Sequence, residues 1–341
     1  MRIDRRDFFR MLGLSAAALA LAAAPSTPVW ADDEATISLA SVGFGFATNF
    51  IADDLGYWRD AGLKVKIVYI AGVGSTNAVL SRSVDFTNSP LTSIIRANIR
   101  GQKIFAIGTA VDGIGQEIVV STAALKAAGI SPDDPIERRG QVLKGKTIAV
   151  DGPNTIAHAL LRYVAHRSGI DPEREVTLAN MAPDAANAAL KRGEIHGFVS
   201  SLPMSALPVH GGYGTTVASG PRGDFPELMP HAGNLIVTQP DFCDKKPSVC
   251  EKIMIGYAKA AALIRDDPKE AMDVVKRRFA NMDPAVFETS FAYTRKWTPA
   301  TLRIDPAVFP NSQKFMIAGG MIKSEEALSD FSSIYTNKYV K

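Results

Sequence analysis

The chain has 341 residues, of which 46% are hydrophobic and 21% charged, so it can bury a large core and is long enough for two lobes. This composition excludes a disordered, fibrous or membrane-embedded protein. Lysine and arginine number 38, against 35 acidic residues. The first 31 residues hold four arginines and two aspartates, so the rest of the chain has 34 basic and 33 acidic residues. This balance gives no indication of a nucleic-acid partner.

Residues 1–31 have the pattern of an export signal. Arg5 and Arg6 precede a weakly apolar, alanine-rich run, and small residues stand at Val29 and Ala31. We therefore predict a twin-arginine signal peptide over residues 1–31, cleavage after Ala31 and a periplasmic location. A Sec signal or an uncleaved anchor is the alternative, although the apolar run of about 14 residues is shorter than the roughly 20 that span a bilayer.

From residue 36 onward, apolar runs alternate with helical patterns. Strands are expected at 36–42, 64–70, 84–89 and 103–111, and helices at 48–62, 75–83 and 90–101. After residue 122 the alternation restarts, with strands at 145–151, 175–181, 195–201 and 215–219 and helices at 154–169, 183–194 and 202–212. One more strand is expected at 234–239, before a C-terminal part that is mostly helical. Such alternation indicates βαβ units on mostly parallel sheets.

Two of these units resemble each other. The stretches AVLSRSVDFTNSP, from Ala78, and AALKRGEIHGFVSSLP, from Ala188, share A-x-L-x-R, a strand, a serine and a proline. Two lobes built on one plan would produce this repeat. Chance similarity of two βα units is the alternative.

Small and polar residues follow five of the expected strands and begin the next helix, at 43–48, 72–76, 88–93, 151–155 and 200–205. Such turns place helix N–H groups and hydroxyls at the sheet edge where open α/β sheets hold ligands. For each polar residue, capping of its own helix is the alternative. The turns contain no lysine or arginine, which favours a singly charged anion or a polar solute over a multiply charged phosphate. Phe44, Phe46 and Met204 could cover an apolar tail or pack in the core.

Motifs of common enzymes are missing or misplaced. GQVLKGKT at 140–147 matches a phosphate-loop pattern, but a strand is expected after it where that loop needs a helix. The chain has no G-x-S-x-G sequence and its five histidines lack metal-ligand spacing, so we expect no catalysis, cofactor or metal. Cys243 and Cys250 are expected to form a disulfide in an exported protein, with two free buried thiols as the alternative.

Four stretches resemble the periplasmic substrate-binding proteins of ABC importers, in the group that includes binders of aliphatic sulfonates, taurine, nitrate and thiamine precursors. They are DLGYWRDAGLKVKIV (54–68), GVGSTNAVLSRSVDF (72–86), LKGKTIAVDGPNTIAHALLRYVAHRSGID (143–171) and AALKRGEIHGFVSSLP (188–203). The resemblance implies an α/β protein with the type II periplasmic binding fold, in which two crossover strands join two lobes and the ligand lies between them. Lobe 1 would comprise residues 32–118 and 232–341, and lobe 2 residues 119–231.

The predicted ligand-binding residues combine the turn pattern with this resemblance. They are Gly43, Phe44, Phe46, Gly74, Ser75, Thr76, Ser89, Thr92, Asn154, Thr155, Ser200, Ser201 and Met204. The implied function is a monomeric, non-enzymatic receptor that closes on a small anionic or polar organic solute and delivers it to an ABC permease in the inner membrane.

The chain departs from the group in two places. His196 stands where an acidic residue is usual, and the second-lobe turn is DGPNT rather than a serine-rich loop. The identity of the solute therefore stays open. Two other functions also stay open: a pyrimidine-precursor binder or pyrimidine-forming synthase of the same fold, and a receptor that signals to a membrane kinase.

Overall fold

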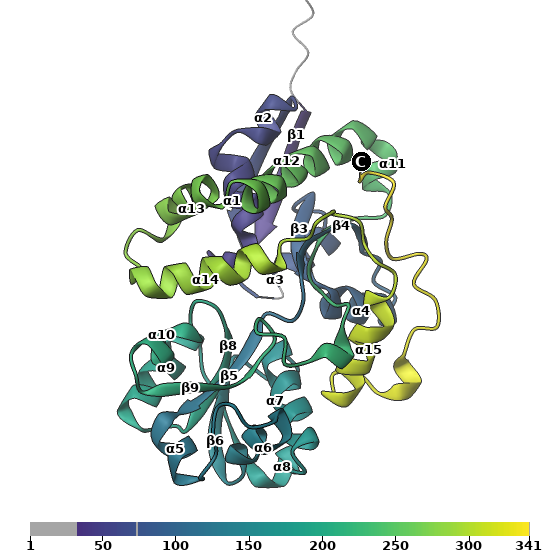
Figure 1. Ribbon diagram of the computed structural model, residues 1–341. Coiled ribbons are helices and arrows are strands. Elements are labelled where there is room, and N and C mark those ends of the chain that lie inside the picture. The colour runs from purple at the N-terminus through teal and green to yellow at the C-terminus, as the bar shows by residue number, and fades with distance from the viewer. Residues whose placement is uncertain (1–32, 73, 341) are drawn as a thin grey trace, which may run out of the picture. The chain divides into compact units, whose positions relative to one another are not determined.

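The computed structural model describes residues 33–72 and 74–340, so the predicted signal peptide lies outside the described residues. Two five-stranded sheets organise this part of the chain (Figure 1). We use lobe 1 for the sheet that contains the first strand, with the helices packed on it, and lobe 2 for the other sheet with its helices. The residues at which one lobe passes into the other remain a prediction. Within the described ranges, no helix has the length and apolar character needed to cross a bilayer.

The lobe 1 sheet has the strand order β2-β1-β3-β10-β4. Its strands are β1 (Asp33–Leu39), β2 (Leu63–Tyr69), β3 (Phe86–Pro90), β4 (Phe105–Asp112) and β10 (Ala232–Thr238). β10 is antiparallel to both of its neighbours, whereas β1 is parallel to β2 and β3.

Helices cover both faces of this sheet. They are α1 (Ala47–Asp54), α2 (Tyr57–Asp60), α3 (Gly74–Leu80), α4 (Leu91–Ile99), α11 (Phe242–Lys245), α12 (Pro247–Asp266), α13 (Pro268–Lys276), α14 (Pro284–Trp297) and α15 (Val308–Ala318). Side chains alternate along β10: Ile236 joins the core beneath α1 and α12, whereas Leu235 and Val237 join the core beneath α4 and α15. A strand buried on both faces explains the continuous apolar run in its sequence.

The lobe 2 sheet has the strand order β7-β6-β8-β5-β9. Its strands are β5 (Gln116–Ser121), β6 (Lys146–Val150), β7 (Val176–Asn180), β8 (Gly197–Ser201) and β9 (Gly214–Ser219). Its helices are α5 (Thr122–Ala127), α6 (Ile136–Gly140), α7 (Ile156–Arg167), α8 (Pro172–Glu175), α9 (Pro183–Arg192) and α10 (Ala206–His210). β5 is antiparallel to β8 and β9, as β10 is to its neighbours in lobe 1.

The two sheets share one plan. β1, β2 and β3 occupy the positions that β6, β7 and β8 occupy in lobe 2, and β10 and β4 match β5 and β9. The two similar stretches that start at Ala78 and Ala188 contain β3 and β8, which hold equivalent central positions.

Two crossovers connect the sheets, one from β4 to β5 and one from β9 to β10. They lie side by side, because Gly113 N donates to His231 O at 2.6 Å. Gly113 has a φ of +74°, and a Cβ on it would lie 2.5 Å from the Trp297 ring. This position therefore requires glycine for both its conformation and its close contact.

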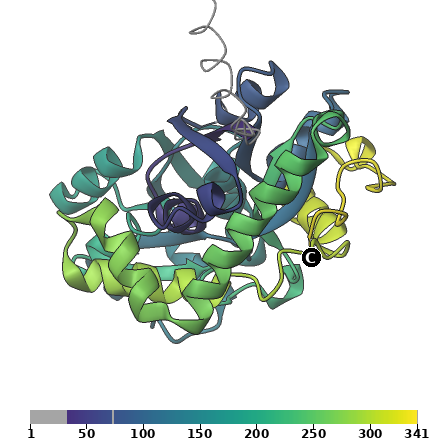
Figure 2. The same ribbon diagram turned by 90° about the horizontal axis from the view of Figure 1, so that it is seen from above.

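The C-terminal part packs against both lobes. Within α15, Met316 belongs to a lobe 1 core, whereas Phe315 belongs to the lobe 2 core beside Tyr163. The end of the chain lies along lobe 1 near α11 (Figures 1 and 2), where Tyr339 Oη donates to Cys243 O at 3.3 Å.

Two expected helices differ from the observed ones. The segment expected as one helix over 48–62 forms α1 and α2, which are separated at Gly56, a residue with a φ of +70°. The helix expected over 202–212 is reduced to α10, because the chain forms a turn over residues 202–205 before the helix begins.

Candidate functional site

The turns at the strand ends of both lobes surround a cavity of about 560 Å³. Lobe 1 contributes the turn after β1 and the starts of α3 and α4, and lobe 2 contributes the turn between β6 and α7 and the end of β8. The crossovers and α14 complete the lining. Carboxyl ends of parallel strands are the usual ligand-binding edge of open α/β sheets, and this volume lies within the roughly 300–1,000 Å³ typical of sites for small organic molecules.

Hydroxyl hydrogen bonds hold the lobe 1 wall of the cleft. Ser75 Oγ lies 2.9 Å from Ser38 Oγ and 2.6 Å from Thr87 Oγ1. Thr76 Oγ1 lies 2.9 Å from Ser89 Oγ. All five residues are buried. These bonds fix the start of α3 against β1 and β3, so the wall is rigid before any ligand arrives.

A second network lies behind this wall. Tyr257 Oη donates to Asn88 Oδ1 at 2.7 Å, and Asn49 Nδ2 reaches the same oxygen at 3.0 Å. Burial raises the pKa of Tyr257, so its phenol stays neutral. The network uses the oxygen of the Asn88 amide and thereby sets the orientation of its nitrogen.

Three buried polar atoms of the lobe 1 wall find no hydrogen-bond partner among the described residues: Thr48 Oγ1, Asn88 Nδ2 and Thr92 Oγ1. Each of these residues is at most 3% exposed, and each lines the cavity. An unpaired polar group in a buried position costs about 1–3 kcal/mol. A solute with oxygen acceptors would relieve this cost.

The lobe 2 wall is more exposed. Thr155 caps α7, because His158 N donates to Thr155 Oγ1 at 3.2 Å. Asn154 has a φ of +57°, a left-handed conformation that asparagine adopts more readily than most residues. Its side chain and that of Ser201, at the end of β8, are exposed. This wall therefore presents a few accessible groups rather than an interlocked network.

Three charged side chains of the described residues line the cavity: Arg96 on α4, Asp112 at the end of β4 and Asp151 after β6. Burial, with a smaller contribution from Asp305, raises the pKa of Asp112 to about 6. His231 also lines the cavity, but burial lowers its pKa to about 4 and it is neutral near pH 7. The charges of this lining therefore sum to about −1 near neutral pH.

Hydrogen bonds join the two lobes at both sides of the cleft. On one side, Arg96 Nη1 donates to Asn154 O at 2.9 Å. On the other, Trp297 Nε1 and Lys296 Nζ both donate to Pro221 O, at 2.9 and 3.0 Å. These contacts hold the lobes in the arrangement seen here.

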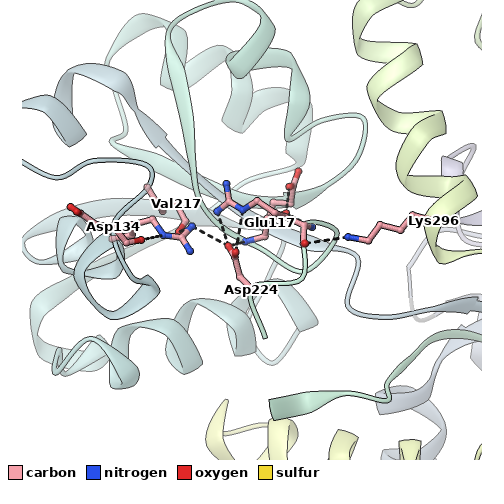
Figure 3. A network of polar contacts seen from close by, with 8 residues as sticks. Glu117, Asp134, Val217, Asp224 and Lys296 are labelled. Carbon is pink, nitrogen blue, oxygen red and sulfur yellow. Dashed lines mark hydrogen bonds and ion pairs between the residues drawn. The ribbon is translucent and has the colours of Figure 1, made fainter. Parts of the chain in front are cut away.

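The loop that carries Pro221 is itself held firmly in lobe 2 (Figure 3). Asp224 accepts hydrogen bonds from Arg139 Nη1 at 3.0 Å and from Arg222 Nη2 at 2.7 Å. Burial opposes ionisation of Asp224, but these two arginines outweigh it and lower its pKa. In Figure 3, Lys296 extends from α14 toward this network, where it also donates to Arg222 O at 3.2 Å.

Most of the predicted ligand-binding residues lie on the cavity wall. Those in the lining are Gly43, Phe44, Phe46, Ser75, Thr76, Thr92, Asn154, Thr155 and Ser201. The Phe44 ring also stacks on Phe279, with centroids 4.5 Å apart, so much of this side chain belongs to the lobe 1 core. That these residues contact a solute remains a prediction.

Four predicted residues lie outside the lining. Gly74 begins α3, and Ser89 lies behind Thr76 as its hydrogen-bond partner. Ser200 is buried within β8, and Met204 is half-buried before α10.

Several lining residues were not predicted from the sequence. They are Arg96, Asp112, Asn234, Tyr293 and Trp297, among others. Tyr293 and Trp297 belong to α14, whose sequence has the apolar spacing of an ordinary packing helix. Asp112 is followed by glycine at the end of an apolar strand, and this combination is the one signal that could have marked a crossover residue.

The predicted disulfide is present in the structure. Cys243 and Cys250 are bonded to each other and link α11 to α12. Both residues are buried in the lobe 1 core and neither lines the cavity.

The two-lobed arrangement with a cleft at the strand ends defines the class of periplasmic binding folds, and comparisons with known proteins agree. The chain belongs to the NMT1/THI5-like family, whose pattern matches residues 44–271. The alkanesulfonate-binding protein SsuA from Xanthomonas axonopodis pv. citri, solved with MOPS, covers 89% of this chain and 98% of its own at a TM-score of 0.68 and 18% identity. The nitrate-binding protein NrtA from Synechocystis PCC 6803 covers 90% and 86% at a TM-score of 0.64 and 14% identity. These likenesses show a shared fold.

A curated relative is the nitrate import ATP-binding protein NrtC of Synechococcus elongatus. It is 26% identical over 233 residues, which are 66% of this chain and 34% of NrtC. The chain thus spans about a third of the length of this relative.

Proposed function

We propose that the protein is the solute-binding component of an ABC importer and that it captures a small polar or anionic organic solute between its lobes. The observation that carries this proposal is the set of unpaired, buried polar atoms of Thr48, Asn88 and Thr92 on the wall of a cavity of about 560 Å³. The family and the names of the relatives, which bind alkanesulfonate or nitrate or serve nitrate import, support the same class.

The mechanism follows from the two walls. Solute oxygens would accept hydrogen bonds from Asn88 Nδ2 and the two threonine hydroxyls of lobe 1, and lobe 2 would add Asn154, Thr155 and Ser201. A solute that contacts both lobes makes more contacts with the closed arrangement than with an open one, so it stabilises the closed arrangement. A permease then recognises that arrangement. No enzymatic step is needed. Cys243 and Cys250 are joined to each other, so neither thiol is available to a synthase reaction.

Calorimetric titration tests the proposal. Residues 32–341 would be unfolded and refolded to remove any co-purified solute, then titrated with alkanesulfonates, taurine, nitrate, bicarbonate and pyrimidines. We expect one-to-one binding of at least one compound and a matching rise in Tm. Failure of every compound, including whatever mass spectrometry finds bound to the untreated protein, would remove the basis of the proposal.

The export route of the protein and the identity of its membrane partner require separate tests. We propose that the twin-arginine segment directs the protein to the periplasm, so replacing Arg5 and Arg6 by lysine should retain it in the cytoplasm.

Deletion of the gene should abolish uptake of the identified solute by whole cells. Normal uptake with a lost transcriptional response to the solute would instead indicate a receptor for a membrane kinase.

A further inference from the structure

The charges on the cavity wall do not suit a bare anion. Among the described residues, Arg96 is the one positively charged side chain of the lining, because His231 is neutral, whereas Asp112 and Asp151 each contribute a negative charge. A monoanion that entered this cavity would meet a lining with a net negative charge. A solute with charges of both signs would not be repelled.

Asp112 is the carboxylate best placed to select for a positive charge. It is half-buried at the cavity, and its carboxylate has no hydrogen bond or ion pair with any described residue. Trp297, which also lines the cavity, packs over the adjacent Gly113. A carboxylate without a partner on a cavity wall suits an ammonium group, which gains an ion pair there, and an aromatic ring on the same wall adds attraction where the ammonium group reaches it.

Arg96 supplies the opposite charge from another part of the wall. Its Nη1 atom donates to Asn154 O, and it forms no ion pair with a carboxylate of the described residues. β10 separates β3, which precedes the helix of Arg96, from β4, which ends in Asp112. The ends of β3 and β4 are therefore about 10 Å apart. Arg96 is not among the charges that shift the pKa of Asp112, so the two side chains do not form a pair.

The unpaired atoms of Asn88, on β3, and Thr92, on α4, belong to the same strand–helix unit as Arg96, whereas Asp112 ends β4. From this arrangement we infer that the cleft takes a zwitterionic solute, with an oxyanion held by Arg96, Asn88 and Thr92 and a protonated amine held by Asp112. The inference rests on the proposed function and specifies its solute class. Bare anions such as nitrate would be poor solutes for this cleft.

Matched pairs of probes test the inference. Taurine and ethanesulfonate differ only in the ammonium group, as do γ-aminobutyrate and butyrate. Each compound would be titrated into solute-free protein, into the Asp112→Asn variant and into Asp133→Asn, which changes an exposed carboxylate outside the cavity. We expect the amine-bearing member of at least one pair to bind about 10-fold more tightly or better.

In Asp112→Asn the ratio of the two affinities should fall to near one. The amine-bearing member loses its ion pair, whereas the amine-free member keeps its affinity or binds more tightly. Asp133→Asn should keep the preference. A merely structural role of Asp112 would instead weaken both members equally, and that result would overturn the inference.

Two further results would also overturn it: equal binding of both members in the unchanged protein, or tight binding of nitrate or bicarbonate with no binding of either pair. In both cases the proposed receptor function would stand, because a solute binds. If no compound bound at all, the receptor function would fall and this inference with it.

Discussion

The two walls of the cleft are built from the same strand plan but differ in how firmly their polar groups are held. In lobe 1, buried hydroxyls such as Ser75 and Thr76 bond to neighbouring strands, and Asn88 is fixed by Tyr257. In lobe 2, Asn154 and Ser201 are exposed at the ends of their strands. Under the proposed function, lobe 1 would therefore be the preorganised dock and lobe 2 the wall that closes over a solute bound there.

Substitution of Asp112 is expected to have the largest effect on stability. It tests whether the lobe 1 wall is strained before a solute binds. Its folded pKa of about 6 lies above the ordinary value of 3.8, so ionisation destabilises the fold. This destabilisation is fully present above about pH 6 and disappears as the pH falls below about 4. Asp112→Asn should therefore raise the free energy of unfolding by about 2–3 kcal/mol at about pH 7.5, and by roughly half as much at about pH 5.

Urea unfolding of the solute-free protein at the two pH values measures this difference. Asp151→Asn is the matched control from the lobe 2 wall, because Asp151 is exposed, and it should change stability by less than about 0.5 kcal/mol. Equal stabilisation by Asp112→Asn at both pH values would show that its charge is not the cause.

Tyr257→Phe tests the network behind the lobe 1 wall. The change removes the hydroxyl bonded to Asn49 and Asn88 and leaves buried amides with fewer partners. Stability should fall by about 2 kcal/mol, and solute affinity should fall as well, because only Asn49 then holds the Asn88 amide. The control is Tyr213→Phe in lobe 2, which removes a 2.9 Å bond to Asn187 at a half-buried position and should cost less than about 1 kcal/mol. Similar losses in both variants would contradict the proposed difference between the lobes.

Thr92→Val separates binding from stability. The valine has nearly the same shape but lacks the buried hydroxyl that finds no partner in the described residues. The solute-free protein should keep or slightly gain stability, whereas affinity for the solute should fall about 10-fold. Calorimetric titration and thermal unfolding measure the two effects. A loss of stability with unchanged affinity would place the hydroxyl outside the binding site.

Asn154→Gly should have the smallest effect and probes lobe 2. Glycine accepts the φ of +57° and keeps the backbone oxygen that Arg96 reaches, so only the side chain is lost. We expect affinity to fall by no more than about threefold. Asn154→Ala serves as the control, since it loses the same side chain but adds about 1 kcal/mol of backbone strain. A loss of affinity larger than that of Thr92→Val would reverse the assignment of the dock to lobe 1.

The fold and part of the cleft could be predicted from the sequence because both depend on local patterns. Alternating strands and helices predicted two α/β lobes, and the polar turns predicted Ser75, Thr92 and Thr155 at the edge where the cavity lies. These residues lie where a strand passes into the next helix, so their position in the chain determines their position at the edge.

The rest of the cleft depends on how distant segments pack. Trp297 and Tyr293 lie at the cavity only because α14 docks beside the crossovers, and nothing in the helical pattern of α14 distinguishes its cleft-facing residues from its core-facing ones. The position of Asp112 at the cavity could be predicted only with the knowledge that β4 ends at a crossover. Ser89 and Ser200 were also predicted from their turns but lie outside the lining: Ser89 is hydrogen-bonded to Thr76 on α3, and Ser200 is buried within β8.

The position of Trp297 gives the protein an intrinsic optical probe. Of the three tryptophans, Trp30 belongs to the predicted signal peptide, and Trp58 is 2% exposed and donates to Ile253 O within lobe 1. Of the two tryptophans that the structure describes, Trp297 is the one that joins the two lobes, through its bond to Pro221 O. Separation of the lobes would break that bond and wet the indole, so emission from the mature chain should shift to longer wavelength on opening. Stopped-flow fluorescence could then follow the hinge in real time without any added dye.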